Sequence, residues 1–443
     1  MPSRFRFYFA AAVFVGAILC AFWVYRQGMQ TPVYQGTPLL RFDFSTYAVP
    51  DKTRWAYQDF TAHFNFVREA WKSHGLRVYT EAGHRELAAA WLGETPARGL
   101  AFGYSPVLFV LLLPLLPLAS GIAYLVFATA SGLAVASLLH RVLLPRLSTG
   151  FEPLLALSIC LFSTAFFNNL IIGQTALLTT AALGAGWALL YDPSARRWKA
   201  GTVKTDLLLA ALLFCLAAKP HVALVLGALL LAARRWRAIG AAAAALFAAT
   251  WVVAPKVGGW PFWCQDYLHL LTHYTRADAG AFLRESINPA IATSLIQPLH
   301  RFTDVPDSTS SALCTALWLA GLAMASLGLQ KKFLPPGCFF QCVVLGFLLF
   351  SPNLMATEDF LLILLLMDEP LRAKGRWGLP FLLALFVAVN ASPYASLFAA
   401  TPLRDWPVAF GAKAILAALV LAQNSKRKTQ KTERDESILQ LLA

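Results

Sequence analysis

The clearest candidate for chemistry in this sequence is an acidic residue that follows aromatic side chains and stands at the start of a helical pattern. Asp59 lies in the stretch WAYQDF (55–60), directly before Phe60. An apolar environment raises the pKa of a carboxylate, which suits a general base that takes a proton from a hydroxyl group. The alternative is a helix N-cap, because Asp is a favoured cap residue and QDFTAHFNFVREAW has the pattern of a helix start. The residues alone favour the cap, and both interpretations stay open here.

A lysine between two apolar runs is the second candidate. Lys219 lies in AAKPHVAL (217–224), where Pro220 interrupts the hydrogen bonding of a helix. Its ammonium group can hold a phosphate, and His221 can assist. The alternative is an interfacial lysine that extends its charge into water. Because the topology given below places Lys219 on the outer side, against the usual bias of positive charge, we favour phosphate binding.

Three further stretches place polar side chains at the ends of apolar segments. A tyrosine hydroxyl or an amide can hydrogen-bond a sugar or a lipid phosphate, but tyrosines also form interface belts and amides also join helices. Carboxylates at a helix start are stabilised by the helix dipole, and they either bind acceptor hydroxyls or only cap the helix. The residues are Tyr104 in FGYSPVLFVLLLPLLPL (102–118), Gln174 in NNLIIGQ (168–174), and Glu358 and Asp359 in SPNLMATEDF (351–360).

The composition predicts the scaffold that positions these residues. Of 443 residues, 58% are hydrophobic and only 14% are charged. The apolar residues come in blocks of about 17–25, the length that crosses a hydrocarbon core of about 30 Å as a helix. We therefore predict an all-α polytopic membrane protein with about 10–12 transmembrane helices. The net charge of +14 lies mostly in short loops, so it indicates topology and not nucleic-acid binding.

Basic clusters between the apolar segments predict which loops face the cytoplasm. From residue 196 onward the segments alternate consistently, whereas upstream one segment between 102 and 191 must be re-entrant or a joined pair. The first segment is expected to be a retained helix, because no small-x-small cleavage site follows it. The predicted organisation is a first transmembrane helix (1–25), an outer loop with Asp59 (26–101), a transmembrane bundle (102–255), an outer loop (256–311), a second bundle (312–423) and a basic cytoplasmic tail (424–443).

Several catalytic signatures are absent from the sequence. It contains no phosphate-binding glycine loop, no GxSxG, no HExxH and no acid-rich metal cluster. A cytosolic enzyme that uses nucleotides is therefore not expected, and neither is a dedicated metal site.

An ordered series of motifs resembles the GT-C glycosyltransferases that use polyprenyl-phosphate sugars. The resemblance is strongest to bacterial family 87, which includes mannosyltransferases of phosphatidylinositol mannoside synthesis. Two positions depart from the family pattern: a tyrosine pair after DF is replaced by His63, Phe64 and Phe66, and Y-P-P is replaced by Tyr104-Ser105-Pro106. The series is DF (59–60), LRVY (76–79), FGYSPVLFVLLLPLLPL, IIGQTALL, AAKPHVALVLGALLLAARRWRAI and SPNLMATEDFLLILLL.

The resemblance implies a GT-C-type bundle and an inverting transfer of a hexose, mannose-like by analogy. The donor would be a polyprenyl-phosphate sugar, and the acceptor a hydroxyl of a glycolipid or glycan on the outer face of the cytoplasmic membrane. Membrane lipids would be partners, with no metal, no other cofactor and no nucleic acid. The implied roles are Asp59 as the base, Lys219, His221 and Gln174 at the donor phosphate, and Tyr104, Glu358 and Asp359 at the sugar or acceptor.

Two other classes of protein remain as alternatives. A transporter or flippase of lipid-linked sugars has a similar number of helices, but we find none of the internal repeats that are frequent in transporters. A polymerase or ligase of cell-envelope polysaccharides would use basic residues of an outer loop. His273, Arg276 and Arg284 keep that alternative open.

Overall fold

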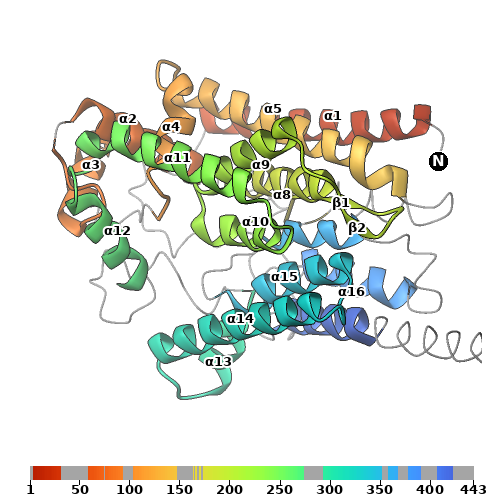
Figure 1. The fold of residues 1–443 in the computed structure, drawn as a ribbon. Helices are drawn as coiled ribbons and strands as arrows, with labels where there is room; N and C mark the ends of the chain where they lie inside the picture. The colour runs from red at the N-terminus through yellow and green to blue at the C-terminus, as the bar shows by residue number, and fades with distance from the viewer. Residues whose placement is uncertain are drawn as a thin grey trace, which may run out of the picture.

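The computed structural model is helical over nearly all the residues it describes, which are 3–30, 58–73, 75–92, 103–146, 163, 165–166, 169–170, 173–273, 293–351, 358–367, 378–390 and 407–422 (Figure 1). In this part of the chain a short hairpin is the one strand pairing, between β1 (Tyr191–Asp192) and β2 (Arg197–Trp198). The all-α prediction is confirmed.

The helices follow one another along the chain with few residues between them. The N-terminal part contains α1 (Ser3–Gln30), α2 (Gln58–Lys72), α3 (Glu81–Leu92), α4 (Val107–Leu112), η3 (Leu113–Leu115), α5 (Ser120–Leu138), η4 (Leu139–Leu143) and η5 (Leu144–Arg146). The middle contains α8 (Ala176–Leu190), α9 (Val203–Leu216), α10 (Pro220–Ala232), α11 (Trp236–Val253), η6 (Ala254–Lys256) and α12 (Phe262–His273). The C-terminal part contains α13 (Ile296–Phe302), α14 (Asp307–Gln330), α15 (Pro336–Phe350), η8 (Glu358–Met367), α16 (Gly378–Asn390) and a helix at Val408–Ala422.

Four helical stretches in the described part are long and apolar enough to cross a membrane: Arg4–Trp23, Ser120–Leu143, Trp236–Lys256 and Ser308–Gln330. Shorter apolar helices accompany them, including α8, α10 and α15. Their outer faces carry exposed large apolar side chains, as on α1, α11 and α14. In water these side chains would be costly, whereas lipid tails cover them. The protein is therefore a polytopic membrane protein, and the predicted number of crossings stays a prediction.

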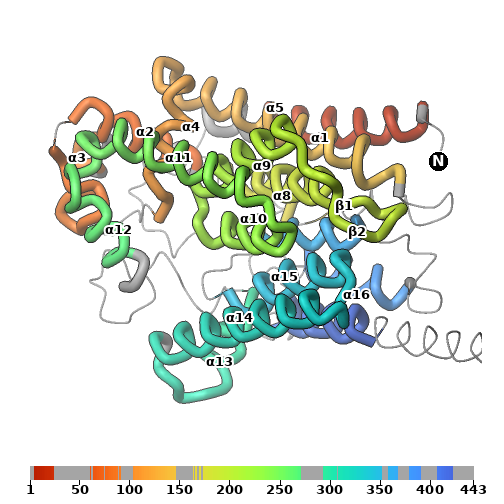
Figure 2. Tube along the Cα trace, in the orientation of Figure 1, coloured from red at the N-terminus to blue at the C-terminus, as the bar shows by residue number. Residues whose placement is uncertain are grey.

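The helices form two groups joined through the core. In Figures 1 and 2 the C-terminal elements α13 to α16 lie below the group of α8 to α11. The element η8 packs against α8, and α15 packs against α10, so residues from both groups meet in the interior. All ten residues of η8 are buried. This junction is where the polar residues predicted for the site come together.

The stretch from Tyr104 to Ser120 begins and ends beside α2. The Tyr104 ring lies 4.5 Å from the His63 ring of α2, centroid to centroid, and the Ser120 hydroxyl donates to Oδ1 of Asn65 on α2 over 3.3 Å. The helical part between them, α4 and η3, has 6 and 3 residues, far fewer than the ~20 that a crossing needs. We therefore assign the re-entrant segment between 102 and 191 to this stretch.

The helices α2, α3 and α12 gather at one end of the molecule, and the N-terminus lies at the other end with β1 and β2 (Figure 1). Arg77, which precedes α3, forms an ion pair with Asp266 of α12, and its Nε donates to Oδ2 over 2.8 Å. The Tyr79 and Tyr267 rings pack with centroids 4.8 Å apart. The described residues of the two predicted outer loops, 26–101 and 256–311, thus contact each other directly.

Candidate active site

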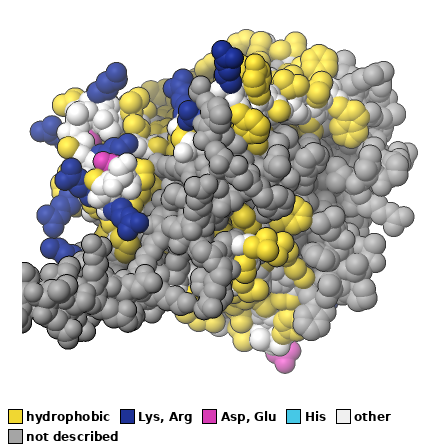
Figure 3. Space-filling view, turned by 90° about the vertical axis from the view of Figure 1, so that its right-hand side faces the viewer, with side chains coloured by type: hydrophobic (Ala, Val, Ile, Leu, Met, Phe, Trp, Pro, Cys, Tyr) yellow, Lys and Arg dark blue, Asp and Glu magenta, His cyan; other side chains and the backbone are white. Residues whose placement is uncertain are grey.

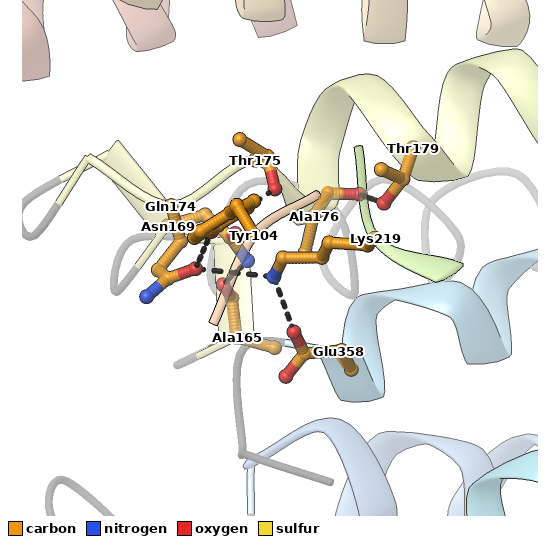
Figure 4. A network of polar contacts seen from close by, with 9 residues as sticks. All are labelled: Tyr104, Ala165, Asn169, Gln174, Thr175, Ala176, Thr179, Lys219 and Glu358. Atoms are coloured by element: carbon orange, nitrogen blue, oxygen red, sulfur yellow. Dashed lines mark hydrogen bonds and ion pairs between the residues drawn. The ribbon is translucent and has the colours of Figure 1, made fainter. Parts of the chain in front are cut away.

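A buried lysine is the centre of a polar cluster drawn from four distant parts of the chain (Figure 4). The Lys219 ammonium donates to Oε1 of Glu358 over 2.6 Å and to Oε1 of Gln174 over 3.2 Å. Lys219 is 7% exposed and Glu358 is 4% exposed. The alternative of an interfacial lysine that reaches into water does not describe this side chain.

The position of Lys219 follows from the interrupted helix around it. Lys219 has extended backbone geometry and precedes Pro220, the first residue of α10. The break between α9 and α10 leaves carbonyl groups without helical partners. Ser105 supplies partners: its N–H donates to Ala218 over 3.1 Å and its hydroxyl donates to Ala217 over 2.6 Å. A proline, the residue of the family pattern at this position, has no N–H and no hydroxyl, so Ser105 adds contacts that the pattern cannot make.

Tyr104 forms one wall of the cluster. Its hydroxyl donates to Oε1 of Gln174 over 3.2 Å and lies 3.5 Å from the Thr175 hydroxyl. The Lys219 ammonium lies 5.5 Å from the centroid of the Tyr104 ring, close enough for a cation–π contact. Tyr104 is therefore buried within the cluster and is not part of an interface belt.

The turn that carries Gln174 lies directly against α2. Gly173 has φ +75°, and a β-carbon on it would be 2.4 Å from the β-carbon of Phe60. Only glycine combines this backbone conformation with this approach. Asp59 is the second residue of α2, one residue before Phe60 and one helical turn before His63. The contacts of Phe60 and His63 therefore bring the first turn of α2 to the cluster.

The structure describes Asp59 through its backbone only. Because α2 begins at Gln58, Asp59 lies inside the first turn rather than at the cap position before it. A carboxylate there is still stabilised by the helix dipole. The side chain of Asp59 lies outside the described part of the structure, so its role as a base stays a prediction.

A second lysine pairs with the neighbouring carboxylate, and the sequence reasoning missed it. The Lys413 ammonium donates to Oδ1 of Asp359 over 2.6 Å and to the Thr293 hydroxyl over 3.0 Å. Both ions of this pair are buried. Asp359, predicted to lie at the sugar or acceptor, thus makes its bonds away from Lys219. A lone lysine inside the apolar segment FGAKAILAALVLA was the signal, since charges at membrane depth are costly and carry a partner.

His221 lies in the first turn of α10, close to Lys219 in sequence. Its ring stacks on Phe347 with centroids 5.7 Å apart. Its Nε2 is shielded from solvent and has no hydrogen-bond partner among the described residues. Asn169, by contrast, donates to Ala165 in its own segment over 2.7 Å and remains outside the Lys219 network.

The remaining candidates cannot be placed. Asn168, Arg276 and Arg284 lie outside the described residues, as does the side chain of His273. In the described part no group of three His, Cys, Asp or Glu residues is arranged to hold a metal ion. The absence of a metal requirement stays a prediction.

The charges of the cluster balance, which limits what it can bind. Glu358 neutralises Lys219, and Asp359 neutralises Lys413. In a region of low dielectric constant a ligand anion must share or replace one of these carboxylates. Glu358 is the one that can be shared, because it lies in the network with Tyr104 and Gln174. The cluster can therefore accept both sugar hydroxyls, through carboxylate and amide groups, and a phosphate at the ammonium group.

The comparisons with known proteins agree with this arrangement. The family model for glycosyltransferase family 87 matches residues 102–352, more than half of the chain. The matched range includes Tyr104, Gln174, Lys219 and His221, while Asp59 precedes it and Glu358, Asp359 and Lys413 follow it. No curated protein and no solved structure matches the chain. From the extent of the family match, the chain belongs to glycosyltransferase family 87 and is a membrane glycosyltransferase.

Proposed function

We propose that this protein is an inverting hexosyltransferase of GT-C type that uses a polyprenyl-phosphate sugar as donor. The observation that carries the proposal is the contact between two parts: the buried Tyr104–Gln174–Lys219–Glu358 network and the first turn of α2 with Asp59. The first part offers groups for a sugar phosphate, and the second offers a carboxylate for proton transfer. Mannose is the sugar suggested by the family resemblance.

The donor head group would bind at Lys219. The bond between the anomeric carbon and the phosphate oxygen breaks during transfer, so negative charge grows on the leaving polyprenyl phosphate. A preorganised ammonium group stabilises that charge in the transition state more than in the ground state. Glu358 would turn from Lys219 toward a sugar hydroxyl, and Gln174 and Tyr104 would hold the sugar. His221 has a shielded nitrogen that can donate to a phosphate oxygen.

Asp59 would act as the general base. It accepts the proton of the acceptor hydroxyl, whose oxygen attacks the anomeric carbon from the side opposite the phosphate, and polyprenyl phosphate leaves with the bonding electrons. This displacement inverts the anomeric configuration and conserves charge and protons without a metal ion. The acceptor is a hydroxyl of a glycolipid or glycan.

The reaction would take place on the outer face of the cytoplasmic membrane. Two features support this sidedness. The network lies near the end of the molecule that carries α2 and α12, whereas the basic clusters expected in the cytoplasm lie around the β1–β2 hairpin (Figure 1).

The test uses purified protein in vesicles with radiolabelled donors. Label should move from a polyprenyl-phosphate hexose to a lipid or glycan acceptor, and not from a nucleotide sugar. If no donor supports transfer but the labelled lipid exchanges between leaflets, the flippase alternative replaces this proposal. Joining of preformed glycan chains without transfer of single sugars would instead indicate the ligase alternative.

A further inference from the structure

A second surface of the molecule gathers positive charge far from the cluster described above. It is formed by the β1–β2 hairpin, the start of α9 and the turn between α10 and α11. We name this surface the basic platform. Its cationic side chains are all exposed, and they are Arg196, Arg197, Lys199, Lys204, Arg234 and Arg237. Figure 3 shows the face of the molecule at this end, with Lys and Arg side chains gathered on its left side and few acidic ones among them.

A buried arginine holds the three loops of the platform together. Arg235 is 6% exposed; its Nη1 donates to Oδ1 of Asp206 over 3.2 Å, and its Nη2 donates to the carbonyl of Lys199 over 2.7 Å. Gly201 lies so close that a β-carbon on it would be 1.8 Å from Nη1. The platform is therefore a fixed arrangement and not a set of independent loops.

The acids of these loops are used internally. Asp206 pairs with Arg235, and Asp192 accepts from the backbone N–H groups of Ser194 and Ala195 in the hairpin turn. Within the described residues, Arg197 and Arg237 form no ion pair. The platform thus presents positive charge to whatever lies next to it.

Apolar side chains border the platform on the side of the membrane spans. Trp236, 63% exposed, begins the candidate span Trp236–Lys256. Val203 and Leu207 of α9 are also exposed. Tryptophan concentrates where hydrocarbon meets the head groups, so the platform lies at head-group level and its cations are within reach of lipid phosphates.

We infer that the basic platform binds anionic phospholipid head groups of the membrane leaflet that it faces. Arginine and lysine attract anionic lipids at the surface of a bilayer, and exposed apolar neighbours anchor the same region in the acyl layer. A nucleic acid would also meet positive charge here, but the position of Trp236 at the start of a membrane span favours lipid. This inference does not depend on the proposed reaction.

The test measures thermal unfolding of the full chain in nanodiscs of phosphatidylcholine alone or with phosphatidylglycerol. Phosphatidylglycerol should raise the Tm of the wild type, and high salt should reduce this rise. The double variant Arg197→Gln/Arg237→Gln should lose at least half of the rise while keeping its Tm in phosphatidylcholine. The control Lys331→Gln/Lys332→Gln removes the same charge from the end of α14 and should keep the full rise.

Three results would overturn the inference. One is an equal Tm in both lipid compositions. Another is an equal phosphatidylglycerol effect in all three proteins. The third is a Tm increase with a single-stranded oligonucleotide in phosphatidylcholine nanodiscs, lost in Arg197→Gln/Arg237→Gln, while phosphatidylglycerol has no effect. If the double variant is less stable in phosphatidylcholine, the single variant Arg237→Gln replaces it.

Discussion

The backbone of Gly173 lies against the β-carbon of Phe60, and a side chain at Gly173 would have its β-carbon 2.4 Å from that atom. This contact joins the helix of the proposed base to the turn that carries Gln174. The contact is short, and Gly173 has a left-handed backbone conformation, so both residues are fixed in position. The geometry of the site therefore depends on a residue that has no functional group.

Gly173→Ala should displace α2 from the cluster. We expect a loss of about 1–3 kcal/mol of stability from strain and overpacking, and a fall in sugar transfer of tenfold or more, since shifts of about 1 Å can cost ~100-fold in rate. Unfolding in detergent and transfer in membranes measure the two effects. Gly227→Ala, in α10 with open space at its β-carbon, is the control and should transfer sugar normally. Normal transfer by both variants would show that the contact does not position the site.

The Lys219–Glu358 pair should separate stability from activity. Lys219→Met leaves a buried carboxylate without its partner, which costs about 3–5 kcal/mol. The double variant Lys219→Met/Glu358→Leu removes both charges and should recover most of that stability, because apolar groups can replace a buried ion pair. Transfer should stay absent and donor binding should stay weak in both variants. Recovery of transfer together with stability would mean that the pair is only structural.

The Asp359–Lys413 pair provides the matched comparison. Asp359→Asn should destabilise the protein, because Lys413 is then buried without its counter-ion. Asp359→Leu/Lys413→Met should restore the stability and retain transfer, since these side chains bond each other and Thr293 rather than Lys219. Both properties are measured as for the first pair. Loss of transfer in a stable double variant would place Asp359 at the sugar or acceptor after all.

A buried histidine should make the region around α3 sensitive to acid. Burial lowers the pKa of His84 from 6.5 to about 4. Since the unfolded chain binds a proton at His84 before the folded chain does, stability falls as the pH drops from 6.5 to about 4 and then levels off. The loss from this residue is about 3 kcal/mol, at 1.36 kcal/mol per pKa unit.

The measurement for His84 is Tm as a function of pH, for the wild type and for His84→Gln. The variant cannot bind the proton, so its Tm should fall less across this pH range, even if it is lower at pH 8. Parallel curves for the two proteins would contradict the assignment. Transfer at neutral pH serves to show that the variant keeps its fold.

The sequence was sufficient for the scaffold and for the members of the main cluster. Apolar blocks of membrane-spanning length predict helices because the backbone must satisfy its hydrogen bonds internally in lipid. Tyr104, Gln174, Lys219 and Glu358 were each recognised as polar residues at the edge of an apolar segment, and the structure brings them together. Polar groups in apolar surroundings need partners, which is why this reasoning works.

The pairing itself was not predictable from the sequence. Nothing local distinguishes Glu358 from Asp359, yet one bonds Lys219 and the other bonds Lys413, because helix packing decides which lysine each one faces. The re-entrant stretch was also hidden, since FGYSPVLFVLLLPLLPL is apolar enough for a crossing and only its contacts with α2 identify it.

The most direct test of the central claim is transfer from a radiolabelled polyprenyl-phosphate hexose by Asp59→Asn beside the wild type. The asparagine has nearly the same shape but cannot accept the proton. Glu69→Gln, a carboxylate on the same helix that pairs with Lys72, is the control and should transfer normally. The account predicts a folded Asp59→Asn protein that binds donor and transfers no sugar. Transfer at the wild-type rate would show that Asp59 is not the base and that the carboxylate only stabilises the start of α2.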